Sequence, residues 1–288
     1  MAPRLQTVHT ITELHRASLA WRRAGQRIGL VPTMGALHRG HMALVYRALA
    51  DCDKVITTIF VNPPQFSPGE DLASYPRDEA GDARVLADAG VDLVFIPDEG
   101  EIYPSGFATQ VSVAGLTEGL CGAHRPGHFD GVATVVCKLL MEAVPDAAYF
   151  GEKDYQQLQM IRRMVADLDI AAEILAVPTV REDDGLALST RNAYLSTDQR
   201  RIAPALFRTI TRIADRFGGG DFEARALEAE GAEALNQAGF DGVDYVAICD
   251  ARTLEPVSGP GAPARVLVAA RLGKTRLIDN VAVADGDT

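Results

Sequence analysis

Short apolar runs alternate with amphipathic segments of helical length over roughly the first two-thirds of the chain. The run Val-Ile-Thr-Thr-Ile-Phe-Val at 55–61 is typical of a buried strand, which should end at Asn62-Pro63-Pro64 because proline cannot donate to a sheet. A helix over 78–89 should end at Gly90, since glycine readily adopts the left-handed conformation that follows many helices. The same reasoning predicts strands at 28–32, 91–96, 147–150 and 172–180, and helices at 40–51, 129–144 and 154–168.

Strands that alternate with helices of these lengths are typical of β-α-β units, whose right-handed crossovers build a mostly parallel sheet. We therefore predict an α/β domain over residues 1–182. Ligands of such sheets bind beyond the carboxyl ends of the strands. The residues that directly follow each predicted strand are thus the first candidates for a functional site.

The pattern changes after about Glu182, where two long helical segments are followed by three short β-type runs. We expect the three strands to form a small antiparallel sheet, so that residues 183–288 make a second, smaller α+β domain. Its predicted helices are 197–217 and 222–238, with glycines 218–220 between them; its strands are 243–249, 264–270 and 277–283, and 258–263 is a loop.

Net charge limits the class of partner. The 288 residues contain 28 Lys and Arg against 39 Asp and Glu, a formal net charge of −11. Such a field repels phosphate backbones, which argues against a protein whose main task is to bind DNA or RNA. It leaves room for one small polyanion held in a locally basic cleft.

Composition also indicates the compartment. No uninterrupted apolar stretch approaches the roughly 18 residues of a membrane span, and residues 1–15 lack the apolar segment of a secretory signal. The cysteines at 52, 121, 137 and 249 are irregularly spaced, which favours buried reduced thiols over disulfides or a zinc site. We predict a cytoplasmic protein without membrane contact.

The strongest candidate for chemistry is Pro-Thr-Met-Gly-Ala-Leu-His-Arg-Gly-His at 32–41, between a predicted strand and a predicted helix. The free N–H groups at a helix amino terminus suit phosphate, and His38 and His41 could donate hydrogen bonds to phosphoryl oxygens as charge develops. Gly40 would allow a ligand to approach the backbone closely. The alternative without a function is that both histidines are partly exposed residues of a loop. A metal site is less favoured than a phosphate site because no third ligand is obvious.

Two further segments carry cations beside a turn. Gly-Glu-Lys-Asp at 151–154 again joins a strand to a helix, so that Lys153 could meet a phosphate and Asp154 could cap the helix or bind a ribose. Leu-Ser-Thr-Arg at 188–191 lies at the predicted domain junction, where hydroxyls and a guanidinium suit a phosphate chain. The structural alternative for 151–154 is a capped helix start with a surface lysine, and that for 188–191 is a polar linker.

Neutral amides complete the set. Gln65 follows the strand at 55–61, and either Gln156 or Gln157 should face the same cleft from the helix after Gly151. Each segment is weak by itself. Together they place cations and amides at the ends of three strands of an acidic protein, which favours a nucleotide and a small anionic cosubstrate.

These residues resemble the pantoate–β-alanine ligase (pantothenate synthetase) family over essentially the whole chain. The histidine segment alone is shared with a wider group of nucleotidyltransferases and aminoacyl-tRNA synthetases, but seven ordered matches are specific. The matching segments are 32–41, 61–66, Tyr-Pro-Arg at 75–77, Arg-Pro-Gly-His-Phe-Asp-Gly-Val at 125–132, 150–157, 184–192 and Arg-Leu-Gly-Lys-Thr-Arg-Leu-Ile-Asp-Asn at 271–280.

The resemblance implies a Rossmann-like domain that binds ATP and pantoate, followed by a smaller domain that acts as a lid. It implies that ATP and (R)-pantoate form a pantoyl adenylate and pyrophosphate, and that β-alanine then displaces AMP to give pantothenate. It also implies a requirement for Mg²⁺ and a homodimer. We expect the lid to close with the help of Gly185 at the junction.

The resemblance also implies roles for individual residues. The catalytic residues would be His41, His38, Lys153 and Arg191. Gln65 would contact pantoate and β-alanine, Gln157 would contact pantoate, and Arg125 would approach the substrate phosphates or carboxylate. Thr190 stands where the family usually has serine; threonine retains the hydroxyl and adds a methyl group. ATP would be bound by Met34, Gly35, Ala36, Leu37, His38, Arg39, Gly40, His41, Gly151, Glu152, Lys153, Asp154, Val180, Leu188, Ser189, Thr190 and Arg191.

Two other functions are consistent with the residues alone. One is a different nucleotidyltransferase with the same histidine pair, which transfers a nucleotide to a phosphate ester. The other is a regulatory protein that binds a nucleotide without turnover, although such a protein would not need both histidines and a junction arginine. A requirement for β-alanine and release of AMP would distinguish the ligase from both.

Overall fold

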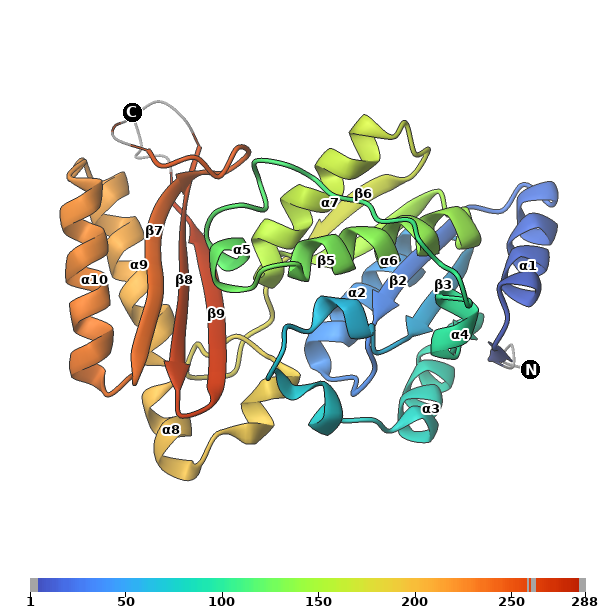
Figure 1. Cartoon of the computed structure of the whole chain (residues 1–288), viewed down its shortest axis with the longest axis horizontal. Helices are drawn as coiled ribbons and strands as arrows, with labels where there is room; N and C mark the ends of the chain where they lie inside the picture. The colour runs from blue at the N-terminus through green and yellow to red at the C-terminus, as the bar shows by residue number, and fades with distance from the viewer. Residues whose placement is uncertain (1–4, 258, 260–262, 285–288) are drawn as a thin grey trace.

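A six-stranded parallel sheet forms the centre of the first lobe, in the computed structural model that describes residues 5–257, 259 and 263–284 (Figure 1). The strand order is β1-β4-β3-β2-β5-β6, and every neighbouring pair is parallel. This confirms the predicted α/β class. The strands are β1 (Gln6–Val8), β2 (Ile28–Thr33), β3 (Lys54–Ile59), β4 (Leu93–Phe95), β5 (Ala147–Gly151) and β6 (Glu173–Val177).

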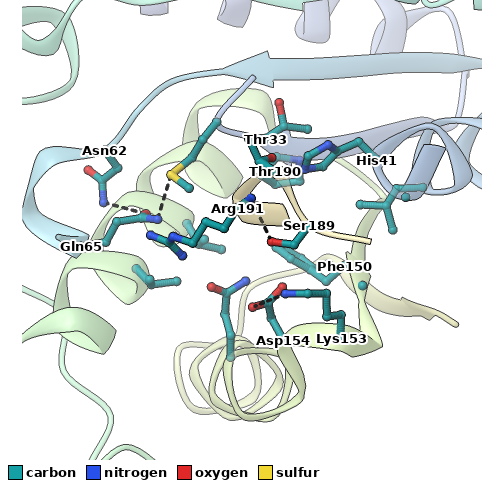
Figure 2. Close-up of a pocket in the computed structure, with 18 of the residues that line it drawn as sticks. Thr33, His41, Asn62, Gln65, Phe150, Lys153, Asp154, Ser189, Thr190 and Arg191 are labelled. Carbon is teal, nitrogen blue, oxygen red and sulfur yellow. Dashed lines mark hydrogen bonds and ion pairs between the residues drawn. The ribbon is translucent and has the colours of Figure 1, made fainter. Parts of the chain in front are cut away.

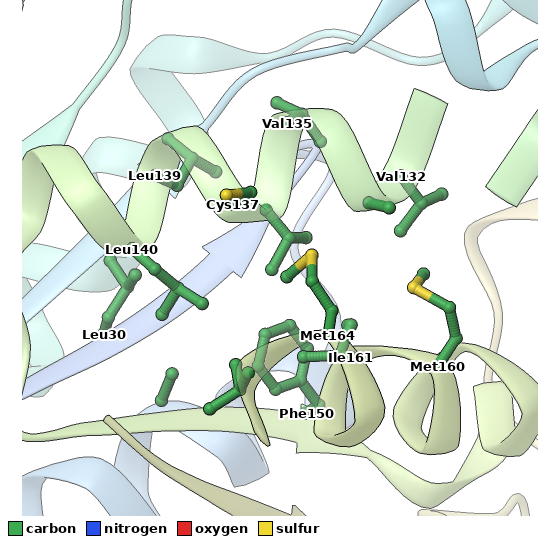
Figure 3. Close-up of a cluster of buried hydrophobic side chains, with 14 of the residues drawn as sticks. Leu30, Val132, Val135, Cys137, Leu139, Leu140, Phe150, Met160, Ile161 and Met164 are labelled. Atoms are coloured by element: carbon green, nitrogen blue, oxygen red, sulfur yellow. The ribbon is translucent and has the colours of Figure 1, made fainter. Parts of the chain in front are cut away.

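Helices cover both faces of this sheet, because side chains that alternate along each strand are buried on opposite sides. Leu30 joins a core with α1, α6 and α7, whereas its neighbour Val31 joins a core with α2 and α3. In Figure 3, Leu140 of α6 lies beside Leu30, and Met164 of α7 lies beside Phe150 of β5. The helices are α1 (Ile11–Arg23), α2 (Arg39–Asp51), α3 (Glu79–Ala89), α6 (His128–Ala143) and α7 (Tyr155–Asp167), with short α4 (Glu99–Ile102) and α5 (Cys121–His124).

The chain changes direction across the sheet at β2. From β2 it proceeds outward through β3 to β4 on one side, and β5 then pairs with β2 on the other side. A crevice at such a switch point is where open α/β sheets bind ligands. The segments that follow β2 and β5 therefore face each other across it.

The second lobe is an antiparallel sheet in the order β7-β8-β9, backed by α9 and α10 on the side away from the first lobe (Figure 1). Alternate residues of the central strand face opposite ways: Val266 packs with the helices, and Leu267 packs into the core of the first lobe. The two lobes thus share buried apolar contacts. The elements are α8 (Thr197–Ile202), α9 (Ala205–Gly218), α10 (Ala224–Ala238), β7 (Gly242–Asp250), β8 (Ala264–Leu272) and β9 (Thr275–Ala282).

Several predicted boundaries were wrong for identifiable reasons. The helix predicted over 197–217 is divided into α8 and α9 at Ala203 and Pro204, because proline cannot donate the amide that would continue α8. The strand predicted over 172–180 ends at Val177, directly before Pro178. Strand β1 and helix α1 were missed, although Thr10 and Glu13 form a readable capping box. The predicted loop at 258–263 lies mostly outside the described residues.

The cysteine prediction is confirmed in one respect and modified in another. All four cysteines are free thiols, and those at 121, 137 and 249 are buried. Cys52 is only partly buried and contacts the hydroxyl of Tyr149 at 3.3 Å. No helix among the described residues is long and apolar enough to cross a membrane.

Because the lobes share a core, we predict that they unfold together. The single tryptophan, Trp21, packs against the core of the first lobe, whereas circular dichroism in the far ultraviolet reports helices of both lobes. The two signals should follow the same urea transition with one midpoint. Two separated transitions would contradict the shared core.

Candidate active site

A cavity of about 250 Å³ opens at the carboxyl ends of β2 and β5, where the switch point predicts it. Its walls come from α2, the turn after β3, the amino end of α6, the turn after β5 and the loop that leads to the second lobe (Figure 2). Fifteen of the predicted site residues line it: Met34, His38, Gly40, His41, Gln65, Arg125, Gly151, Lys153, Asp154, Gln157, Val180, Leu188, Ser189, Thr190 and Arg191.

The two histidines cap the amino end of α2 with their own rings. The Gly40 N–H donates to Nδ1 of His38 at 3.1 Å, and the His38 N–H donates to Nδ1 of His41 at 3.3 Å. The rings stack with their centroids 4.0 Å apart. Since each Nδ1 accepts a hydrogen bond, the proton of each neutral ring resides on Nε2. Two Nε2–H donors therefore remain for a ligand.

The sequence predicted that Gly40 gives a ligand room to approach the backbone, but the structure shows that it gives room to the His38 ring. A Cβ on residue 40 would lie 2.8 Å from Cε1 and 3.0 Å from Nδ1 of His38. Any side chain there would push the His38 ring away from the helix end. The glycine is thus required by the neighbouring imidazole.

Both imidazoles are neutral at physiological pH. Desolvation in the cavity, with the neighbouring His38 as a second cause, lowers the pKa of His41 to about 3. Desolvation and the nearby Lys153 also lower the pKa of His38. The pair consequently offers two hydrogen-bond donors that carry no positive charge.

Lys153 brings the positive charge to the opposite wall. It belongs to a single 3-10 turn, η3 (Glu152–Asp154), between β5 and α7. Its side chain is 20% exposed, and its Nζ lies 4.0 Å from an oxygen of Asp154 (Figure 2). That separation is long for an ion pair, so the ammonium keeps donors available for an anion.

The Gln65 amide is held in place by its neighbours in η1 (Pro63–Gln65) and α6. The Asn62 amide, which is 1% exposed, donates to Oε1 of Gln65 at 3.2 Å and to the Gly131 carbonyl at 3.1 Å. Nε2 of Gln65 lies 2.9 Å from the sulfur of Met34. A Cβ on Gly131 would lie 2.5 Å from the Pro64 carbonyl, so only glycine allows this approach.

Both arginines of the site are paired with adjacent carboxylates. Arg125 contacts Glu70 through two bonds of 2.7 Å, and Arg191 contacts Asp71 through bonds of 3.0 and 2.8 Å. Burial alone would raise the pKa of Glu70, but the Arg125 guanidinium outweighs it and holds that pKa below its usual value. Among the described residues that line the cavity, the positive charge without a close carboxylate partner is thus that of Lys153, and the arginines become available only if their carboxylates move.

His128, which the sequence analysis did not single out, organises this group. Its Nδ1 lies 2.7 Å from the Gln65 carbonyl, and its Nε2 lies 2.9 Å from the Arg125 guanidinium. A carbonyl only accepts and a guanidinium only donates, so the proton must be on Nδ1. Desolvation and Arg125 lower the pKa of this buried ring to about 4. The sequence signal that could have identified His128 is its position in segment 125–132, which matches the family.

Five predicted ATP contacts do not line the cavity. The amides of Ala36 and Leu37 both donate to the buried Asp82 carboxylate at 2.8 Å, and Gly35 packs against the same side chain. The side chains of the other two are engaged elsewhere: Arg39 pairs with Glu182 and Glu152 pairs with Arg265. Of the two helix glutamines, Gln157 faces the cavity, and Gln156 instead bonds the backbone around residues 116–121.

The loop between the lobes is a tight hairpin in which Gly185 is enclosed. A bridge between Arg181 and Ala187 places Val180 and Leu188 together at the cavity wall. A Cβ on Gly185 would lie 2.4 Å from the Phe207 ring. Both this close packing and the φ of +92° at Gly185 account for the glycine.

Comparison with known proteins gives the family. A family model described as pantoate-beta-alanine ligase matches residues 6–282. The chain belongs to this family. It is therefore an enzyme of the ligase class, which sets aside both the regulatory protein and the phosphate-ester transferase left open above.

Curated relatives and solved structures of the ligase family agree over nearly the full length. The chain is 54% identical to pantothenate synthetase of Paramagnetospirillum magneticum over 98% of this chain and 99% of that one. It is 49% identical to the crystal structure of pantothenate synthetase from Thermus thermophilus, with a TM-score of 0.90 over 96% and 99% of the two chains. A Francisella tularensis relative, described as complexed with beta-gamma ATP and β-alanine, is 35% identical, with a TM-score of 0.81 over 96% and 97%.

The buried, neutral imidazole of His128 predicts that the free energy of unfolding depends on pH. Unfolded histidine titrates near about 6.5, whereas folded His128 takes up a proton only at about pH 4. Between these values the unfolded chain binds more protons, so acidification lowers the free energy of unfolding by about 1.4 kcal/mol per pH unit for this group. Because asparagine does not titrate, His128→Asn should lose that part of the slope.

Urea unfolding at several pH values between about 6.5 and 4.5 measures the difference. His15→Asn, on the exposed face of α1, controls for the exchange of histidine itself. Parallel curves for the wild type and His128→Asn would show that His128 is not held neutral by its partners.

Proposed function

We propose that this cavity condenses (R)-pantoate with β-alanine to give pantothenate, driven by cleavage of ATP to AMP and pyrophosphate. Membership of the ligase family and the Francisella relative with beta-gamma ATP and β-alanine support the reaction. The observation that carries the proposal is the convergence of His38, His41 and Lys153 on one cavity from opposite sides of the switch point.

The first step forms a pantoyl adenylate. A carboxylate oxygen of pantoate bonds to the α-phosphorus of ATP, and the bond from that phosphorus to the pyrophosphate oxygen breaks. Negative charge grows on the departing pyrophosphate. The Nε2–H groups of His38 and His41, the Lys153 ammonium and the Arg191 guanidinium bind this charge more strongly in the transition state than in ATP.

The second step uses the other wall. The amine of β-alanine attacks the acyl carbon of the adenylate, AMP leaves with the electrons of the carbon–oxygen bond, and the nitrogen releases one proton to water as the amide forms. Gln65 and Gln157 offer uncharged amides to the hydroxyls of pantoate, and Arg125 offers its guanidinium to a substrate carboxylate. No enzyme nucleophile is needed, because each attacking atom belongs to a substrate.

Substrate anions must compete with the carboxylates that hold the arginines. Glu70 and Asp71 are consecutive residues, so one displacement of that segment would release both Arg125 and Arg191. A triphosphate or carboxylate can take over such a guanidinium through equally good bidentate bonds. The acidic pair thus keeps the cavity close to neutral until an anion enters.

The donor set accommodates Mg²⁺ only as a companion of the nucleotide. Among the described residues, no group of three or more His, Cys, Asp or Glu side chains could hold a metal ion. Asp154 is the carboxylate that lines the cavity without an arginine partner, and Mg²⁺ commonly uses one protein carboxylate together with substrate phosphates. Asp154 would hold it, and the bound ion would neutralise charge on the pyrophosphate.

We further propose that residues 1–182 bind the substrates and that residues 183–288 act as a lid over them. A second hollow of about 850 Å³ between the lobes, which shares Lys153 and Arg191 with the lining of the cavity, supports this division. The family resemblance supports a homodimer in the cytoplasm. The net charge of −11 supports small-molecule substrates over nucleic acid.

The reaction is tested by incubating the protein with ATP, pantoate and β-alanine and analysing AMP, pyrophosphate and pantothenate, with each reactant omitted in turn. We expect pantothenate and AMP only when all three are present, and pyrophosphate from ATP and pantoate without β-alanine. Transfer of the nucleotide to a phosphate ester, or binding of ATP without pyrophosphate release, would refute the proposal.

His41→Ala should lower the rate of adenylate formation by about 10²–10³, the scale of one lost transition-state donor. Pyrophosphate release measures this step. His15→Ala, at an exposed histidine that does not line the cavity, is the matched control and should keep the wild-type rate. A near-normal rate for His41→Ala would remove this imidazole from the chemistry.

A further inference from the structure

The second lobe reaches back to the turn that carries Lys153. The side-chain amide of Asn280, in β9, donates to the carbonyl of Glu152 at 2.9 Å and to the carbonyl of Lys153 at 3.0 Å. Asn280 is 3% exposed, so these bonds are shielded from water. Both hydrogens of one buried amide are thus directed at two consecutive carbonyl oxygens of the catalytic turn.

The turn has little to hold it from within its own lobe. Neither the start of η3 nor the start of α7 has a side-chain cap, although both ends would accept one. A Cβ added to Gly151, the residue before the turn, would meet nothing within 4 Å. Among the described residues, the side-chain hydrogen bonds to the carbonyls of residues 152 and 153 come from Asn280 of β9.

A second side chain of the same sheet fixes the residues on either side of Lys153. The Arg265 guanidinium, from β8, pairs with Glu152 at 2.9 Å and stacks on the Tyr155 ring at 3.8 Å. This contact also explains why Glu152 points away from the cavity. Two neighbouring strands of the second lobe thus hold the turn from its outer side, leaving the Lys153 side chain on the cavity side.

Asn280 is itself held rigidly. Its backbone N–H donates to the Asp279 carboxylate at 2.7 Å, and that carboxylate forms two bonds of 2.6 and 2.9 Å with Arg181. Arg181 lies in the hairpin between the lobes, with its guanidinium 3.8 Å from the centre of the Phe207 ring. A continuous set of bonds therefore runs from the hairpin through β9 to the lysine turn.

We propose that Asn280 is a positioning residue, which fixes the turn so that the Lys153 ammonium meets the pyrophosphate as it leaves. The inference rests on the proposed function, since it acts through Lys153. A charged donor stabilises a transition state only when it is held in place beforehand, and a displacement of about 1 Å can lower a rate by about 10²-fold. The second lobe is then part of the catalytic apparatus as well as a cover for the cavity.

The test uses the full-length enzyme and the rate of pyrophosphate release from ATP and pantoate. Asn280→Ala removes both donors, and Asn280→Asp keeps the shape but places carboxylate oxygens against the two carbonyls. We expect both variants to lower kcat by about 10- to 100-fold while KM for pantoate changes less than about threefold. Urea midpoints close to that of the wild type identify variants that remain folded.

Tyr155→Phe is the matched control. The Tyr155 hydroxyl donates to the Ala251 carbonyl at 2.8 Å, so this change also removes one bond between the lobes, two residues from Lys153, while keeping the ring on which Arg265 stacks. We expect a rate within about twofold of the wild type, since this bond does not reach the lysine turn.

A double-mutant cycle with Lys153→Ala separates positioning from general support of the fold. If Asn280 acts through Lys153, then Asn280→Ala should lower the rate less than about twofold further once Lys153 has been removed. The same fold-loss in both backgrounds would overturn the inference and assign Asn280 a structural role. A wild-type rate for Asn280→Ala beside an impaired Lys153→Ala would overturn it alone, whereas a wild-type rate for Lys153→Ala would overturn the proposed role of the lysine as well.

Discussion

The change of direction between β2 and β5 is the constraint on which the site depends. Parallel strands present their carboxyl ends at one edge, and the chain leaves β2 toward one side of the sheet and β5 toward the other. The segments that follow these strands must therefore face each other across a crevice. One brings two imidazoles on a helix start, and the other brings a lysine on a short turn. The strand order alone thus brings these distant parts of the sequence together.

Electrostatics in the cavity follow from hydrogen bonding more than from net charge. Desolvation keeps His41 and His128 neutral, and their partners decide which nitrogen carries the proton. The arginines are neutralised by consecutive acidic residues, so the cavity of this acidic protein presents few bare charges before an anion enters. In the proposed reaction, an entering triphosphate would therefore have to replace these carboxylates at the guanidinium groups.

Much of this was predictable from sequence, because the signals were local. Periodicity predicted the parallel sheet, and glycine predicted the end of α3 at Gly90, which has φ of +89°. The candidate site followed from residues placed directly after strands. Contacts between distant segments were not predictable: nothing local indicates that Asp82 takes the amides of Ala36 and Leu37, or that Asn280 bonds the turn at 152–153. His128 and Asn280 lay in segments that matched the family, but their partners emerged only with the fold.

In the proposed reaction, nucleotide and pantoate meet in the cavity between α2 and the turn after β5. A crystal structure of the enzyme with pantoate and a non-hydrolysable ATP analogue tests it most directly. We expect the α-phosphate within hydrogen-bond distance of Nε2 of His41, the β- and γ-phosphates near Lys153, and a pantoate carboxylate oxygen beside the α-phosphorus. Nucleotide bound elsewhere, for example in the separate hollow beside Phe222 and Glu228, with this cavity filled by water, would show that the reaction does not take place here.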